Sequence, residues 1–162
     1  MAKFVPASRG GALPSMEGAT LIIADVSLGN VGQLAADLIV TTLGMEVVAY
    51  LDDAAVLPVA GNEEGVMHVS AELYHAPAHK LFVLQQRSAC ISSQADALSA
   101  RLITWATASS VKSVLLLSSL AADLRTDARL ARGVLLSVAF PLGPHGGAAR
   151  ERVGVLGWDC IG

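Results

Sequence analysis

The sequence is short of charge. Only 15% of its 162 residues are Asp, Glu, Lys or Arg, against roughly 25% in typical globular domains. At the same time 53% are hydrophobic, and the mean hydropathy is +0.55. These values predict either extensive burial or a surface that a partner covers. The net charge of -3 and the lack of a basic cluster argue against a nucleic-acid ligand.

Cysteine and long apolar runs are also scarce. Cys90 and Cys160 cannot build a disulfide framework, and they lack the His/Cys spacing of zinc sites, so we expect a reduced, cytosolic setting. No apolar run reaches the ~18 residues that a membrane-spanning helix needs. Residues 1–13 hold two basic residues without a continuous apolar segment, so no secretory signal is expected. At this length, one domain is the default expectation.

The most informative stretch is 20–51, which has the pattern of strand, glycine loop, helix and strand. The apolar run at 21–23 is typical of a strand buried on both faces. A helix is expected from Val31, with Gly44 at its C-terminal cap, and 45–51 returns as a second strand. Its expected buried face comprises Val31, Leu34, Ala35, Leu38, Ile39 and Thr42. The stretch therefore predicts a right-handed βαβ unit with parallel strands.

The loop before this helix holds the candidate site residues. Ser27 and Asn30 are expected to bond free N–H groups at the helix start, and Gly29 and Gly32 to allow a sharp turn close to the strand. The loop could bind phosphate, but it lacks both the G-x-G-x-x-G fingerprint and the Walker lysine. A tight strand-to-helix turn is therefore the favoured interpretation.

The rest of the chain adds further elements. Residues 1–19 form an extended lead-in, in which Phe4 either docks on the core or frays. Residues 57–65 are loop-like, and strands at 66–74 and 80–87 are expected to form a hairpin. A helix capped by Ser92 or Ser93 and a buried strand at 112–119 suggest a second crossover. The stripe of that helix comprises Leu98, Leu102, Trp105 and Ser109.

No catalytic set assembles from the polar residues. The candidates considered are Asp25, Asp52 and Asp53 near strand ends, His68, His75 and His79 as metal ligands, Ser118 and Ser119 after a strand, and Cys90 as a nucleophile. None has the neighbours that its chemistry requires, and no G-x-S-x-G elbow surrounds the serines. Arg87, at the end of a strand, could pair with an acidic group on this chain or on another protein. The sequence thus predicts no enzyme, no cofactor and no metal.

The segment 27–39, SLGNVGQLAADLI, closely resembles the signature of the proteasome assembly chaperone 2 family. The residues of this signature that we single out, as structural or partner-facing, are Ser27, Gly29, Asn30, Gly32 and Gln33. The likeness continues through TLGM at 42–45, LPVAGN at 57–62, QRS at 86–88, and 105–119. With FVP at 4–6, it covers roughly residues 4–130.

This resemblance implies a non-enzymatic chaperone. Its partners would be proteasome assembly chaperone 1, in a heterodimer, and the 20S proteasome α-subunits, with no nucleic acid and no membrane. The heterodimer would promote α-ring formation and prevent off-pathway α-ring dimers, in the cytoplasm and nucleus. The implied fold is a three-layer, Rossmann-like α/β domain with a mixed, largely parallel sheet. Alternatives are a phosphorylase-like enzyme or small-ligand binder, and an inactive truncated form.

The C-terminal part departs from the family pattern. We expect a lead-in at 1–19, the α/β chaperone domain at 20–130, incomplete at its C-terminus, and a divergent, partly disordered tail at 131–162. Within this tail, 134–140 could add an edge strand, and proteases should cut first at 141–152. Cys160, Ile161 and Gly162 lack the tyrosine of the hydrophobic-Tyr-any tripeptide at the end of some relatives.

Overall fold

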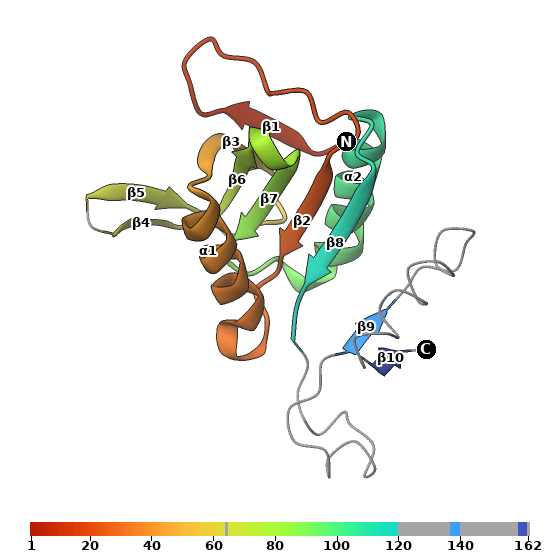
Figure 1. Cartoon of the computed structure of the whole chain (residues 1–162). Helices are drawn as coiled ribbons and strands as arrows, with labels where there is room; N and C mark the ends of the chain where they lie inside the picture. Colours follow the sequence, from red (N-terminus) through yellow and green to blue (C-terminus); the bar gives the residue numbers. More distant parts are fainter. Residues whose placement is uncertain (64, 120–136, 140–158, 162) are drawn as a thin grey trace. The chain divides into compact units, whose positions relative to one another are not determined.

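A computed structural model describes residues 1–63, 65–119, 137–139 and 159–161 (Figure 1). The chain divides into two units, Met1–Leu120 and Ala121–Gly162. The second unit contains β9 (Ser137–Ala139) and β10 (Asp159–Ile161), which pair in parallel. The domain boundary expected at 130 and the protease-sensitive segment expected at 141–152 both lie outside the described residues.

The first unit is built on a six-stranded mixed sheet with the order β1-β3-β6-β7-β2-β8. Its strands are β1 (Lys3–Pro6), β2 (Thr20–Ala24), β3 (Glu46–Asp52), β6 (Ala71–Ala76), β7 (Leu81–Gln86) and β8 (Ser113–Leu117). Strand β2 pairs in parallel with β7 and β8, whereas the pairs β1/β3, β3/β6 and β6/β7 are antiparallel. The sheet is therefore mixed, as expected, and two of its five strand pairs are parallel.

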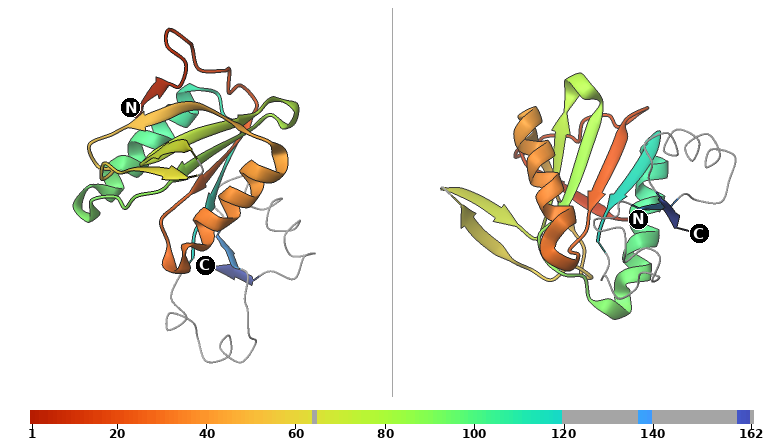
Figure 2. Two further views of the ribbon diagram at one scale, coloured as in Figure 1. Left: turned by 90° about the vertical axis from the view of Figure 1, so that its left-hand side faces the viewer. Right: turned by 60° about the horizontal axis from the view of Figure 1, so that its bottom comes forward.

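Two helices, α1 (Val31–Leu43) and α2 (Ala95–Ala108), cover opposite faces of this sheet and make three layers (Figures 1 and 2). Alternation along β2 explains the arrangement, because successive side chains of a strand point to opposite faces. Leu21 joins the cluster beneath α2 that includes Leu98 and Trp105, and Ile22 joins the cluster beneath α1 that includes Ala36. The continuous apolar run of β2 thus matches a strand buried on both faces.

The unit β2–α1–β3 has the predicted elements, and its two strands are parallel. They are not neighbours, because β6 and β7 lie between them in the sheet. Gly44 ends α1 in the left-handed conformation at φ 57°, as its cap position predicted. The expected buried face of α1 is wrong in part. Ile39 packs on the core, but Val31, Leu34 and Leu38 face solvent.

The expected hairpin of 66–74 with 80–87 is confirmed only in its inner half. Strands β6 and β7 pair around the short helix η2 (Pro77–His79). Residues 66–69 leave the sheet as β5 (Val66–Val69) and pair with β4 (Ala60–Glu63), within a stretch expected to be a loop. The break occurs at Ser70, whose carbonyl accepts bonds from the backbone N–H groups of Arg87 and Ser88. We call the β4–β5 pair the arm (Figure 1).

The N-terminal lead-in is partly a strand. β1 pairs with β3, and the ring of Phe4 stacks on Trp105 of α2 with 4.1 Å between centroids, so Phe4 docks rather than frays. The stripe expected on α2 is confirmed for Leu98, Leu102 and Trp105, which are buried. The short helix η3 (Ser92–Gln94) precedes α2, and neither Ser92 nor Ser93 forms the expected side-chain cap.

Candidate functional site

The loop of the signature residues makes one turn of 3-10 helix, η1 (Leu28–Asn30), before α1 begins. Gly29 and Asn30 both adopt left-handed backbone angles, with φ of 66° and 55°. Neither Ser27 nor Asn30 makes a side-chain cap, so the capping expected of them is wrong. A capping side chain needs an extended backbone at the cap position, whereas Asn30 is left-handed there. The turn closes instead through the Asn30 N–H, which donates to the Ser27 carbonyl at 3.0 Å.

Gly32 lies where the first turn of α1 meets the ends of β2 and β8. A Cβ atom at this position would lie 2.5 Å from the Leu117 carbonyl oxygen and 3.0 Å from that of Asp25. Both neighbours are backbone atoms, which cannot rotate away as a side chain can. The close approach expected for Gly32 is therefore present, and it is set by packing between helix and sheet.

Gln33 connects the loop to the sheet. Its side-chain amide donates to the Gln86 carbonyl at 3.2 Å, and the Gln85 amide donates to the Gln33 carbonyl at 3.4 Å. The same Gln85 amide donates to Asp37 Oδ1 at 2.7 Å. Because Gln85 and Gln86 are buried at the end of β7, these bonds fix the height of α1 above the sheet.

Glu72 is the centre of a buried polar network under α1, and its side chain is 1% exposed. It accepts hydrogen bonds from Tyr74 Oη at 2.6 Å, the Val69 N–H at 3.0 Å and Arg87 Nε at 3.2 Å, and it lies 3.0 Å from His68 Nδ1. Burial alone would raise the pKa of Glu72, but these hydrogen bonds outweigh it and lower the pKa. Glu72 is thus a buried carboxylate whose charge is satisfied within the chain.

Arg87 settles the question that the sequence left open, because it pairs with acidic groups of this chain. Its guanidinium contacts Glu72, lies 3.4 Å from Asp37 Oδ1 and donates to Gln85 Oε1 at 3.1 Å. Asp37 belongs to α1, and Glu72 is bonded to His68 and Val69 of the arm. The ion pairs therefore hold α1 and the arm in a fixed relation.

Outside this network, α1 presents an apolar face to solvent. Its members are Leu28, Val31, Leu34 and Leu38, which are 52% to 69% exposed. Their spacing of three or four residues places them on one side of η1 and α1. Periodicity missed this face because α1 is apolar on two sides, and the pattern alone does not tell which side meets the sheet.

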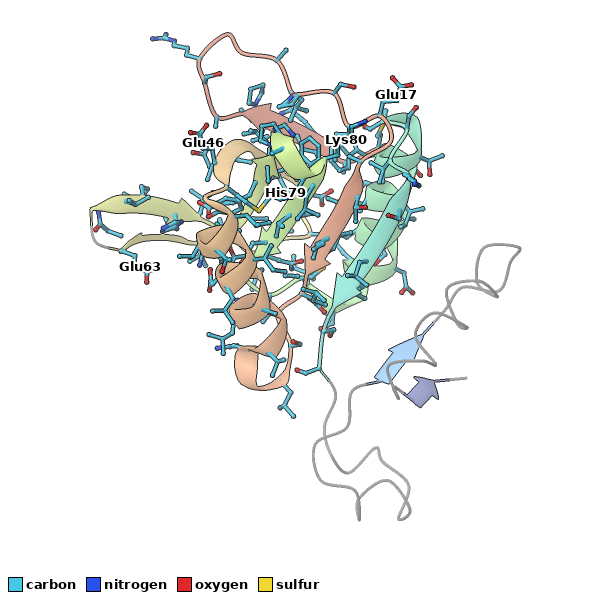
Figure 3. The ribbon with its side chains drawn as sticks, in the orientation of Figure 1. Glu17, Glu46, Glu63, His79 and Lys80 are labelled. Carbon is cyan, nitrogen blue, oxygen red and sulfur yellow. The ribbon has the colours of Figure 1, made fainter. Side chains whose placement is uncertain are left out.

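The other candidates stay apart or have structural roles. Asp53 is held by Arg101, with both contacts at 2.7 Å, and Asp52 pairs with Lys3. His68 belongs to the arm, His75 stacks on Phe82, and His79 lies at the turn between β6 and β7 (Figure 3). Over 1–63 and 65–119, no three His, Cys, Asp or Glu side chains gather to hold a metal. Within those same ranges, no helix is long and apolar enough to span a membrane.

Comparisons with known proteins agree on one family. The model of the PAC2 family matches residues 21–141, further along the chain than the motif resemblance to residue 130. Proteasome assembly chaperone 2 of Nematostella vectensis is 38% identical over 137 residues, which is 78% of this chain and 56% of that protein. The Danio rerio protein of the same name is 36% identical over 159 residues, 93% of this chain and 60% of that protein. The human one is 37% identical over 135 residues, 78% of this chain and 50% of that protein.

Two archaeal proteins of known structure share the fold. Pyrococcus furiosus PbaA, described as an archaeal homolog of proteasome-assembly chaperone, superposes with a TM-score of 0.75 at 15% identity, covering 100% of this chain and 64% of that one. PbaB of the same organism, described as an archaeal proteasome activator, gives 0.62 at 12% identity, covering 99% and 66%. These likenesses confirm the α/β fold. The chain spans 50% to 60% of the length of the curated relatives named above.

Proposed function

Because the chain belongs to the PAC2 family, we propose that it acts in proteasome assembly as a chaperone and not as an enzyme. The name shared by its curated relatives supports this role. The observation on the molecule itself that carries the proposal is the uncharged apolar face of α1, since large exposed apolar patches mark protein interaction sites.

The same proposal includes partners and place of action. The chain pairs with proteasome assembly chaperone 1, and the heterodimer binds 20S α-subunits, promotes α-ring formation and prevents off-pathway α-ring dimers. It works in the cytoplasm and nucleus. The polar residues support a binding role, since Glu72, Arg87 and Asp53 are all engaged in pairs within the chain.

The signature loop supports the same proposal. Glycine is required at position 32 because the carbonyl oxygens of Leu117 and Asp25 leave no room for a Cβ atom. Phosphate binding is therefore not needed to explain this glycine. The side chain of Gln33 is used to hold α1 on β7. The five signature residues thus shape and position the helix that carries the apolar face, and the loop serves partner binding through its structure.

Co-expression tests the proposal. The full chain is produced with proteasome assembly chaperone 1 and tagged α-subunits, and the purified products are weighed by native mass spectrometry. We expect a 1:1 heterodimer and its complexes with α-subunits. A folded chain that co-purifies with none of them would refute the proposal. Titration with phosphate or nucleosides in a calorimeter tests the enzyme or ligand-binding alternative, which a micromolar site would favour.

A further inference from the structure

We propose that the apolar face of α1 and the arm together form one surface, and that this surface binds the partner chaperone of the proposed heterodimer rather than the α-subunits. This inference rests on the proposed function and assigns a place to its permanent interface. Seven exposed apolar residues make up the surface: Leu28, Val31, Leu34 and Leu38 of the helix face, Leu57 and Val59 in the segment that enters the arm, and Val66, which shares one side of β5 with His68.

A chain of polar contacts connects the helix to the arm. Asp37 lies one turn after Leu34, at the edge of the apolar face of α1, and contacts Arg87. Arg87 contacts Glu72, which in turn holds His68 and the Val69 N–H of β5. Three consecutive side-chain contacts thus lead from the edge of the helix face to the base of the arm.

The arm itself indicates a covered surface. It is a two-stranded hairpin, and such a pair is at best marginally stable alone in water. Every residue of β4 is exposed, and the outer residues of β5, Val66 and Met67, are 56% and 60% exposed. Figure 3 shows Glu63 at the outer end of the arm. A partner that covers α1 would also supply the packing that the arm lacks.

Area and charge point to a permanent partner. At roughly 100 Å² of exposed apolar surface for each large side chain, the seven residues supply roughly 700 Å², close to the ~800 Å² per partner of a standard interface. Along η1 and α1 the one charged side chain is Asp37, and it is engaged with Gln85 and Arg87. Permanent interfaces are apolar and depleted of charge in this way. An α-subunit, which an assembly chaperone must later release, fits such a surface less well. The occupant that we assign is therefore the partner chaperone, with a matching uncharged, apolar face.

Charge-inserting variants test the assignment in the co-expressed complex. Leu34→Glu/Leu38→Glu changes the helix face, Val66→Glu changes the arm, and Ile103→Glu on α2 is the matched control, since Ile103 is 53% exposed on the other side of the sheet. The first two should weaken binding of the partner chaperone at least about tenfold in Kd, as for a central interface residue. The control should leave it unchanged, and melting temperatures check that each chain is folded.

Each possible result of these binding measurements either supports or refutes the assignment of the surface. If the wild type binds neither partner nor α-subunits, the proposed function fails first. If the wild type binds the partner and both surface variants bind it equally well, this inference is wrong while the proposed function stands. If the surface variants still bind the partner chaperone but no longer bind the α-subunits, the surface belongs to the α-subunit interface and the inference is wrong. If the helix substitutions break a homodimer of the chain and spare the heterodimer, the occupant is a second copy. Should the double helix variant not fold, Val66→Glu alone carries the test.

Discussion

Replacing Gly32 by alanine tests how the signature loop works. The new Cβ would lie 2.5 Å from the Leu117 carbonyl oxygen, closer than such atoms approach in proteins, and 3.0 Å from the Asp25 carbonyl oxygen. Since both are backbone atoms at the ends of adjacent strands, relief requires the first turn of α1 to move away from the sheet. That movement would stretch the bond from Gln33 to Gln86, now 3.2 Å.

The expected cost is that of an overpacked position, about 1–3 kcal/mol of unfolding free energy. In a domain of this size each kcal/mol lowers the melting temperature by about 2–4 °C, so Gly32→Ala should melt roughly 2–12 °C below the wild type. Gly32→Val adds two methyl groups and should melt lower still. Thermal unfolding followed by circular dichroism gives the measurement.

Gly61→Ala provides the control. Gly61 lies in β4, and a Cβ there would meet nothing within 4 Å, so its melting temperature should stay within a few degrees of the wild type. If Gly32→Ala melts like Gly61→Ala, the packing explanation of Gly32 is wrong. If it also loses partner binding, the loop itself is a contact surface.

The remaining predictions concern buried charges. Arg87→Met should lower the unfolding free energy by about 3–5 kcal/mol, because it leaves the Glu72 carboxylate buried without its cation, and Glu72→Gln in the same chain should restore much of it in urea titrations. Tyr74→Phe should cost about 1–3 kcal/mol by the same assay, since Glu72 loses a donor. Burial and the hydrogen bond to Glu72 raise the pKa of Tyr74 to about 12, so in an ultraviolet titration Tyr74 should ionise at a higher pH than an ordinary tyrosine does. The hydrogen bonds from Arg101 lower the pKa of Asp53 below its ordinary value of 3.8. The ion pair therefore stabilises the folded chain fully above that pH, and this contribution is lost as the pH falls through the folded pKa of Asp53. In Arg101→Leu, the urea midpoint should no longer show this part of the decrease at acid pH.

The sequence predicted the elements that have a clear period. Strand β2 and helix α2 were recognisable from the apolar run at 21–23 and from the stripe of Leu98, Leu102 and Trp105. The side of α1 that meets the sheet was predicted incorrectly for Val31, Leu34 and Leu38. A helix with apolar residues on two sides can pack on the sheet with either side. Contacts with strands that are distant in the sequence determine which side is buried. The small residues Gly32 and Ala36 lie on the buried side, and close packing against the sheet requires such residues.

The polar network could not be predicted for a related reason. Its parts come from α1, β5, β6 and β7, and they meet only through the register that places Glu72 opposite Gln85. A shift of one residue would turn Glu72 to the other face of the sheet. The break at Ser70, which sends β5 out to β4, likewise depends on bonds from Arg87 and Ser88 and leaves no local signal.

The low charge of the chain had two explanations, burial or a covered surface, and the described structure supports both through one arrangement. Its buried charged groups form ion pairs within the chain, Glu72 with Arg87 and Asp53 with Arg101. Arg87 also engages Asp37, the one charge of α1, and so leaves the helix face apolar. An isolated chain gains nothing from keeping such a face in water, because burying each large apolar side chain is worth about 1.5–3 kcal/mol. The same ion pairs that satisfy the interior fix α1 and the arm in place, so the partner binding that we propose would need no further ordering of these two elements.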